Sequence, residues 1–157
     1  MIYKIGLRIS GDLLYPDSLI ERINGNCLIV SKHSPLDRKF NNREVLYEFG
    51  SITFWHPNKF STENNIIEYE EWFITFLLTN YQLFIEQNVE DVEFYIEAYH
   101  DNDQCNFAIF DKKLLKKISH IEVSFPVSTY LLTPDYYQNW ANEIEAIWLS
   151  SHDQQSG

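Results

Sequence analysis

Apolar and polar residues alternate in four segments of the chain, and this two-residue period is typical of β-strands with one buried face. The four segments cover residues 2–9, 45–54, 92–99 and 121–127. Gly50 interrupts the second segment, which predicts a β-hairpin or a bulged strand. Pro126 suits an edge position or the outer face for the fourth, because proline cannot donate a ladder hydrogen bond. The apolar residues 27–30 predict a further short strand, and the polar residues 31–42 predict a long loop.

Apolar residues recur at spacings of three and four positions in other segments, which predicts amphipathic helices. The longest helix is predicted over residues 65–87, with Glu68, Glu70 and Glu71 on its solvent side. Three shorter helices carry start or stop signals, such as a proline in the first turn, an aspartate or threonine cap, or a terminating glycine. These helices are predicted from Pro16 to Gly25, from Asp111 to Ile118, and over residues 134–149.

Strands with one apolar face and helices with one apolar stripe can bury these surfaces against each other in two layers. We therefore predict an α+β fold. It is a two-layer sandwich in which a mainly antiparallel sheet of four to six strands has helices packed on one face. No repeat or linker divides the sequence, so residues 1–150 are predicted to form a single domain. The small, polar residues 151–157 are predicted to form a flexible tail.

The composition points to a compartment and excludes several classes of partner. Hydrophobic residues make up 45% and aromatic residues 16% of the 157 residues, which is enough to bury a core. A net charge of −11 disfavours nonspecific binding to nucleic acid and to anionic membranes. The first residues contain no signal-peptide core, and no apolar run reaches the length of a membrane span. We therefore expect a cytoplasmic protein whose cysteines are reduced.

Negative charge is concentrated in one part of the chain. Residues 60–111 contain twelve Asp or Glu residues and no Lys or Arg. Within this region, the strand predicted at 92–99 has apolar side chains on one face, and tyrosines and carboxylates on the other. The outward row gives the predicted partner-binding residues, which are Glu93, Tyr95, Glu97, Tyr99, Asp101 and Asp103. A surface of carboxylates and tyrosines suits a basic protein partner.

Segments that resemble metal-binding or catalytic motifs lack the spacing that these motifs need. Residues 10–12 lie between a strand and a helix, but they lack the glycine spacing and the lysine of a phosphate-binding loop. The acidic turn at 101–103 would need a glycine at Asn106 and a glutamate at Lys112 to bind calcium as an EF-hand. The two thiols, which show no zinc, redox or nucleophile pattern, are Cys27 and Cys105. We therefore expect no metal, no cofactor and no catalytic residue.

A series of motifs follows one order through most of the chain. The series begins with the opening strand, which ends in Ile9-Ser10-Gly11-Asp12, and with the helix start Pro16-Asp17. A strand near Ile52–Trp55, the long helix and the strand at 92–99 follow. The series ends with Asn106-Phe107-Ala108-Ile109, which leads into Leu114-Leu115 and a closing strand. In this order the chain resembles domain-of-unknown-function family 4279 over about residues 3–130. The family often has a glycine in place of Asn106 and an acidic residue in place of Tyr15. The resemblance implies a compact α/β or α+β domain, and it implies no particular reaction.

Two classes of function fit these observations. The first is a non-enzymatic binding protein, in its most specific form a bacterial immunity protein that neutralises a basic toxin such as a nuclease. A nuclease carries Lys and Arg to hold phosphates, and an acidic surface imitates those phosphates. The alternative is a small-ligand sensor or an enzyme with a pocket between sheet and helices, lined by the abundant aromatic residues. A homodimer that buries the acidic face is a third option.

Overall fold

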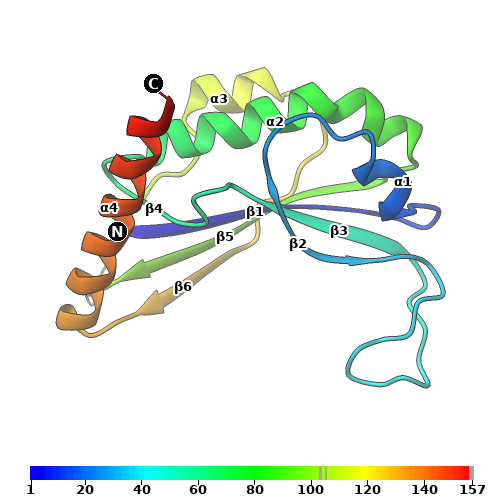
Figure 1. The fold of residues 1–157 in the computed structure, drawn as a ribbon, viewed down its shortest axis with the longest axis horizontal. Coiled ribbons are helices and arrows are strands. Elements are labelled where there is room, and N and C mark those ends of the chain that lie inside the picture. The colour runs from blue at the N-terminus through cyan, green and yellow to red at the C-terminus, as the bar shows by residue number, and fades with distance from the viewer. Residues whose placement is uncertain (103, 105, 156–157) are drawn as a thin grey trace.

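The computed structural model describes residues 1–102, 104 and 106–155, with side chains up to Ser151. These residues form a six-stranded sheet and four helices (Figure 1). The strands are β1 (Ile2–Gly11), β2 (Leu28–His33), β3 (Gly50–Trp55), β4 (Ser61–Thr62), β5 (Asp91–His100) and β6 (Val127–Leu131). The helices are α1 (Pro16–Ile20), α2 (Ile66–Glu86), α3 (Lys112–Lys117) and α4 (Pro134–Gln155).

β1 is the central strand of the sheet. The strand order is β2-β3-β1-β5-β6, and each neighbouring pair is antiparallel except β5 with the edge strand β6. The short strand β4 pairs with Ile2 and Tyr3 at the start of β1, and β3 pairs with β1 from Gly6 onward. β5 follows the opposite edge of β1 along nearly its whole length.

The helices α2 and α3 cover one face of the sheet, and no helix among the described residues forms a layer on the other face (Figure 1). The core lies between the sheet and α2, where Leu7 of β1 and Phe73 of α2 are fully buried. α4 stands at one end of the sheet (Figure 1), and Ile144 and Trp148 in its middle join the core. This arrangement confirms the predicted α+β sandwich with helices on one face.

A tyrosine from α2 fills a break in the sheet ladder. The backbone N–H of Ile5 lies between the part of β1 that pairs with β4 and the part that pairs with β3. The hydroxyl of Tyr69 accepts a hydrogen bond from this N–H at 3.0 Å and donates one to the carbonyl of Lys59 at 2.6 Å. Tyr69 is fully buried, so both partners are needed to satisfy its hydroxyl and the unpaired backbone groups.

His56, directly after β3, lies in a cluster of aromatic rings. Its imidazole stacks on Trp148 at 5.2 Å between ring centroids and meets Trp72 edge-on at 4.9 Å. Its Nδ1 accepts a hydrogen bond from the backbone N–H of Asn58 at 2.9 Å. Burial lowers the pKa of His56 from 6.5 to about 4, so the ring is neutral at neutral pH. The cluster fastens α4 and the turn after β3 to α2.

Glu70 corrects one expectation about α2. Its position in the predicted helix suggested a solvent-facing side chain, but it is buried. Its Oε1 accepts a hydrogen bond from the backbone N–H of Phe110 at 2.7 Å, and burial raises the pKa of this carboxyl group. Phe110 has a positive φ of 57°, which a non-glycine residue adopts only rarely. The carboxylate therefore holds the segment before α3 in an unusual turn.

The short helix α3 begins as predicted. Asp111 caps it, since its Oδ1 accepts hydrogen bonds from the backbone N–H groups of Lys113 and Leu114 at 2.6 and 2.9 Å. These bonds satisfy two donors that have no partner within the first turn of a helix.

Two predicted boundaries near the C-terminus are wrong. β6 begins at Val127 and pairs in parallel with β5, whereas residues 121–126 make only scattered bonds to β5, such as the one from Ile96 N–H to the carbonyl of Pro126. The edge position predicted from Pro126 is confirmed. α4 continues to Gln155 instead of ending near 149, because no proline or glycine interrupts residues 150–155.

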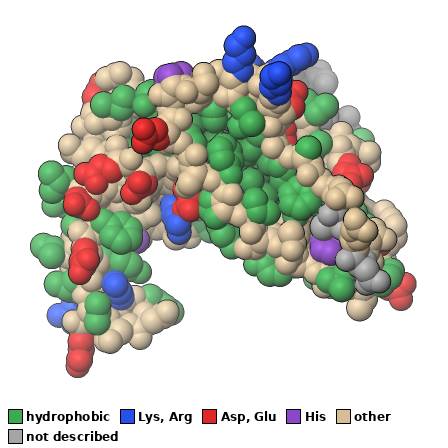
Figure 2. All heavy atoms as spheres, turned by 180° about the vertical axis from the view of Figure 1, so that it is seen from behind, with side chains coloured by type: hydrophobic (Ala, Val, Ile, Leu, Met, Phe, Trp, Pro, Cys, Tyr) green, Lys and Arg blue, Asp and Glu red, His purple; other side chains and the backbone are tan. Residues whose placement is uncertain are grey.

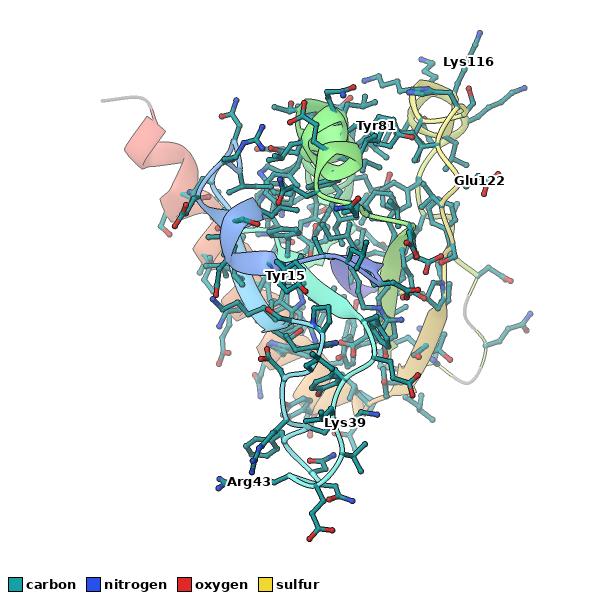
Figure 3. All side chains as sticks on the ribbon, turned by 90° about the vertical axis from the view of Figure 1, so that its right-hand side faces the viewer. Tyr15, Lys39, Arg43, Tyr81, Lys116 and Glu122 are labelled. Atoms are coloured by element: carbon teal, nitrogen blue, oxygen red, sulfur yellow. The ribbon has the colours of Figure 1, made fainter. Side chains whose placement is uncertain are left out.

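Residues 34–49, which connect β2 and β3, are here called the arm. Part of the strand predicted at 45–54 lies in the arm, because Val45 and Tyr47 pair with the arm itself and not with the sheet. The N–H groups of Lys39 and Leu36 donate to the carbonyls of Val45 and Tyr47, each at 2.9 Å. The alternation at 45–49 therefore reflects an irregular hairpin. The arm projects on the side of the sheet away from α2 (Figures 1 and 3).

The neutral state of His56 predicts a pH dependence of stability. The unfolded chain binds a proton near pH 6.5 and the folded protein only near pH 4, so protons favour unfolding between these values. We expect the free energy of unfolding to fall by about 3 kcal/mol across this interval because of His56. His56→Asn keeps an acceptor for the Asn58 N–H and should lose this part of the pH dependence, as measured by urea unfolding.

The exposed His120 provides the control, and His120→Asn should follow the wild type. Equal pH dependence of His56→Asn and wild type would contradict the neutral, buried assignment.

Glu70 and its neighbour Glu71 form a matched pair for a stability test. Glu70→Ala removes a charged acceptor from a buried N–H and should lower the free energy of unfolding by about 2 kcal/mol. Glu71 is exposed on the same helix, and Glu71→Ala should change stability by less than about 0.5 kcal/mol. Chemical denaturation measures both values, and equal effects would show that the Glu70–Phe110 bond does not stabilise the fold.

Candidate functional site

The face of the sheet without helices is here called the open face. Alternation along β1, β3, β5 and β6 places on it, among others, ten side chains that are at least partly exposed. They are Lys4 and Arg8 of β1, Thr53 and Trp55 of β3, Glu93, Tyr95, Glu97 and Tyr99 of β5, and Ser128 and Tyr130 of β6. The structure thus brings four of the six predicted binding residues together on one uncovered surface.

The other two predicted residues lie beyond the end of β5. Asp101 follows the strand and lines a groove at the end of the sheet with Glu63, His100 and Tyr137. The N-terminal amino group lies 3.2 Å from the Glu63 carboxylate in the same region. Asp103 lies outside the described residues.

The carboxylates of the open face are paired with cations of the neighbouring strand. Lys4 is directly opposite Glu97 in the β1–β5 register, and its Nζ lies 2.7 Å from Oε2. Arg8 is opposite Glu93 and forms an ion pair with it. The four side chains carry two positive and two negative charges. The two glutamates in the row that we expected to be an acidic surface are therefore neutralised by cations within the sheet.

Aromatic rings make up much of the rest of the open face. Tyr99 stacks on Tyr130 at 4.9 Å, and its hydroxyl donates to Glu97 Oε2 at 2.8 Å. Burial, followed by the nearby Glu97 carboxylate, raises the pKa of Tyr99. A hydrogen bond with Tyr95 raises the pKa of Tyr130. The tyrosines are thus linked to each other and to the ion pair, which fixes their orientation before any partner binds.

Trp55 belongs to the same surface although it lies two strands away from the tyrosines. Lys4 Nζ lies 4.4 Å from the centroid of the Trp55 ring, which is a cation–π distance. Gly6 leaves room for this ring, because a Cβ atom there would come within 3.2 Å of Trp55 Nε1. Lys4 therefore joins Trp55 on one side to Glu97 on the other.

Two projecting elements border the open face. At one end, Trp140 of α4 packs edge-on against Tyr99 at 5.0 Å. At the other end, Tyr47 of the arm stacks on His33 of β2 at 3.5 Å, and Phe49 meets the same ring edge-on at 5.3 Å. Figure 2 shows the molecule from behind as an arch, with a hollow beneath the sheet next to the descending arm. The open face is thus a broad, concave surface.

Two grooves of the size of a small ligand lie beside helices of the protein. A groove of about 460 Å³ runs beside α2 and includes Trp72 and Phe76, and another of about 330 Å³ separates α4 from residues 57–60. Among the described residues, no three His, Cys, Asp or Glu side chains come together as a metal site would need. Cys27 is half-buried and burial raises the pKa of its thiol, which disfavours the reactive thiolate. Cys105 lies outside the described residues.

Sequence reasoning from β5 alone missed Lys4, Arg8, Trp55 and Tyr130. A signal for the two cations was available, because Lys4 and Arg8 have the same four-residue spacing as Glu93 and Glu97 and lie on the polar positions of the opening strand. Antiparallel pairing of the two strands would have matched the charges. Trp55 and Tyr130 gave no such signal, since their places depend on strand order.

Comparisons of the chain with protein-family models, with curated proteins and with solved structures gave no match. The resemblance to family 4279 therefore stays a prediction. None of the helices in the described part of the chain combines the length and apolar character of a membrane span.

The Lys4–Glu97 pair predicts a measurable coupling energy. Its side chains are only 18% and 13% exposed, whereas those of the Arg22–Glu86 pair are 53% and 45% exposed. A double-mutant cycle with Lys4→Met and Glu97→Gln should give about 1 kcal/mol or more. The same cycle with Arg22→Met and Glu86→Gln should give less than about 0.5 kcal/mol. Urea unfolding supplies the free energies of unfolding. A coupling energy of zero between Lys4 and Glu97 would mean that this ion pair does not organise the open face.

Proposed function

We propose that this protein is a non-enzymatic binding protein that docks a protein partner on the open face. The observation that carries the proposal is a tyrosine- and tryptophan-bearing sheet face that no helix covers, between α4 and the arm (Figure 1). Tyrosine and tryptophan are enriched among the residues that dominate binding energy at protein interfaces. Their rings contribute large contact areas with few rotatable bonds, so ordering them on binding costs little entropy.

The shape of this surface favours a macromolecular partner. Its side chains come from four neighbouring strands, and the grooves of the size of a small ligand lie beside α2 and α4. A standard protein interface buries about 800 Å² on each partner, which requires a broad surface of this kind.

The charge distribution favours a basic partner. The protein carries a net charge of −11, which attracts a cationic protein over distances comparable to the Debye length and raises the association rate. On the open face itself, Arg8 is 52% exposed in its pair with Glu93. A cation of the partner can exchange with Arg8 at this carboxylate without desolvating a fully buried pair. The preformed pairs then select the position of the partner's cations.

An immunity protein that neutralises a basic toxin, such as a nuclease, is the specific form of this proposal. Such a partner holds nucleic-acid phosphates with Lys and Arg, and an acidic protein competes for the same side chains. A cytoplasmic location would place the inhibitor where the toxin acts.

If a neighbouring gene encodes a basic protein domain, binding to that domain tests the proposal. Titration calorimetry with the two purified proteins should show a complex that weakens as salt is added. Tyr95→Ala should weaken it by at least about tenfold, because truncation of an interface anchor costs more than about 1.4 kcal/mol. Tyr15 is an exposed tyrosine outside the open face, and Tyr15→Ala serves as the matched control. The absence of a complex, or equal affinities of the two variants, would contradict the proposal.

A further inference from the structure

The tip of the arm is a basic element in an acidic protein. Residues 38–43 contain Arg38, Lys39 and Arg43 and no carboxylate, in a chain with a net charge of −11. Between these cations, the side chain of Phe40 is 93% exposed. Figure 3 shows Lys39 and Arg43 at the end of the molecule opposite Tyr81 of α2. A cationic tip with an uncovered aromatic ring is chemically suited to a groove with an aromatic floor and an acidic rim.

The arm has an ordered backbone and carries an unusual amount of exposed apolar surface. Its two sides are joined by backbone hydrogen bonds, including one from Tyr47 N–H to the carbonyl of Asp37 at 2.9 Å. Lys39 Nζ lies 5.5 Å from the centroid of the Tyr47 ring, which holds this side chain along the arm. The exposed large apolar residues of the arm are Leu36, Phe40, Val45, Leu46 and Phe49. Apolar side chains that gather in this way on a projection indicate a contact surface.

The groove beside α2 has the complementary chemistry. Its volume is about 460 Å³, and its floor contains the rings of Trp72 and Phe76, which stack at 4.9 Å between centroids. Glu68 and Glu71 line the same groove, and no Lys or Arg is among its described lining residues. Gly25 closes one side, where a Cβ atom would lie within 3.2 Å of the Phe76 ring. The groove therefore offers two carboxylates next to an aromatic floor.

The arm and the groove of one molecule lie on opposite sides of the sheet. α2 is above the sheet and the arm is below it in both perpendicular views (Figures 1 and 3). The arm of one chain thus cannot fill its own groove. We propose that the arm tip of one copy docks in the α2 groove of a second copy, with Phe40 on the Trp72–Phe76 floor and the arm cations beside the two carboxylates.

This contact uses two different surfaces of the protein, so it joins copies head to tail. A head-to-tail contact leaves a free arm at one end and a free groove at the other, and copies can continue to add as concentration rises. Salt weakens the contact because its charges lie at the protein surface. The inference goes beyond the proposed function, since it involves neither the open face nor another kind of protein, and it is measured on this protein alone.

Sedimentation velocity of the purified protein tests the inference. The average mass should rise with protein concentration at low salt and fall when salt is added. Phe40→Ser should weaken association at least about tenfold, and so should the arm variant Arg38→Glu/Arg43→Glu and the groove variant Glu68→Lys/Glu71→Lys. The variant Lys112→Glu/Lys116→Glu changes two charges on α3, away from both surfaces, and should associate like the wild type. A wild type that stays monomeric at every concentration and at low salt would overturn the inference.

A mixture of the two charge-reversed variants makes the test specific. Each variant alone has like charges on its arm and its groove, so neither should self-associate. In the mixture, the acidic arm of one variant meets the basic groove of the other, and the basic arm of the second meets the acidic groove of the first. A complex in which the two variants alternate should therefore form. Its formation would also show that both variants are folded. If the mixture stays monomeric while the wild type associates, the arm–groove pairing is wrong.

Discussion

The register of β1 against β5 is the constraint on which both faces of the sheet depend. In this register Ile5 lies opposite Ile96 and faces the helices, while Lys4 lies opposite Glu97 and Arg8 opposite Glu93 on the open face. A shift of either strand by one residue would turn its side chains over and bury its two charges beneath α2. The cost of burying those charges without their partners is several kcal/mol per charge, so the core and the ion pairs select the same register.

The charge pattern of the molecule follows from this arrangement. On the open face Glu93 and Glu97 are paired with cations, and α2 carries part of the excess of negative charge, whereas the arm tip is positive. The proposed partner therefore meets a tyrosine surface with fixed charge positions inside an overall negative field. The arm tip and the groove next to Glu71 form a separate complementary pair on opposite sides of the sheet.

Several titratable groups of this protein stabilise irregular segments of the chain. Tyr69 satisfies the Ile5 N–H at a break in the ladder, and Glu70 holds the Phe110 turn. His56 fastens the turn after β3 beneath Trp148. The shifted pKa values of these three residues have a common cause, which is burial in the core. Together they attach segments that have no regular backbone pairing to the sheet and to α2.

The sequence by itself determined the features that depend on local periodicity and capping. β1, β5 and α2 follow from alternation or helical spacing, the start of α3 follows from the Asp111 cap, and alternation alone put Tyr95 and Glu97 on one face. Tertiary structure decided which residues face each other. The pairing of Lys4 with Glu97 spans 93 positions, and Glu70 meets an N–H that lies 40 positions away. Local sequence patterns indicate which side of a strand or helix is apolar. Strand order and long-range contacts determine the partner of each polar group. The ion pairs of Glu93 and Glu97 and the burial of Glu70 were therefore established only by the tertiary structure.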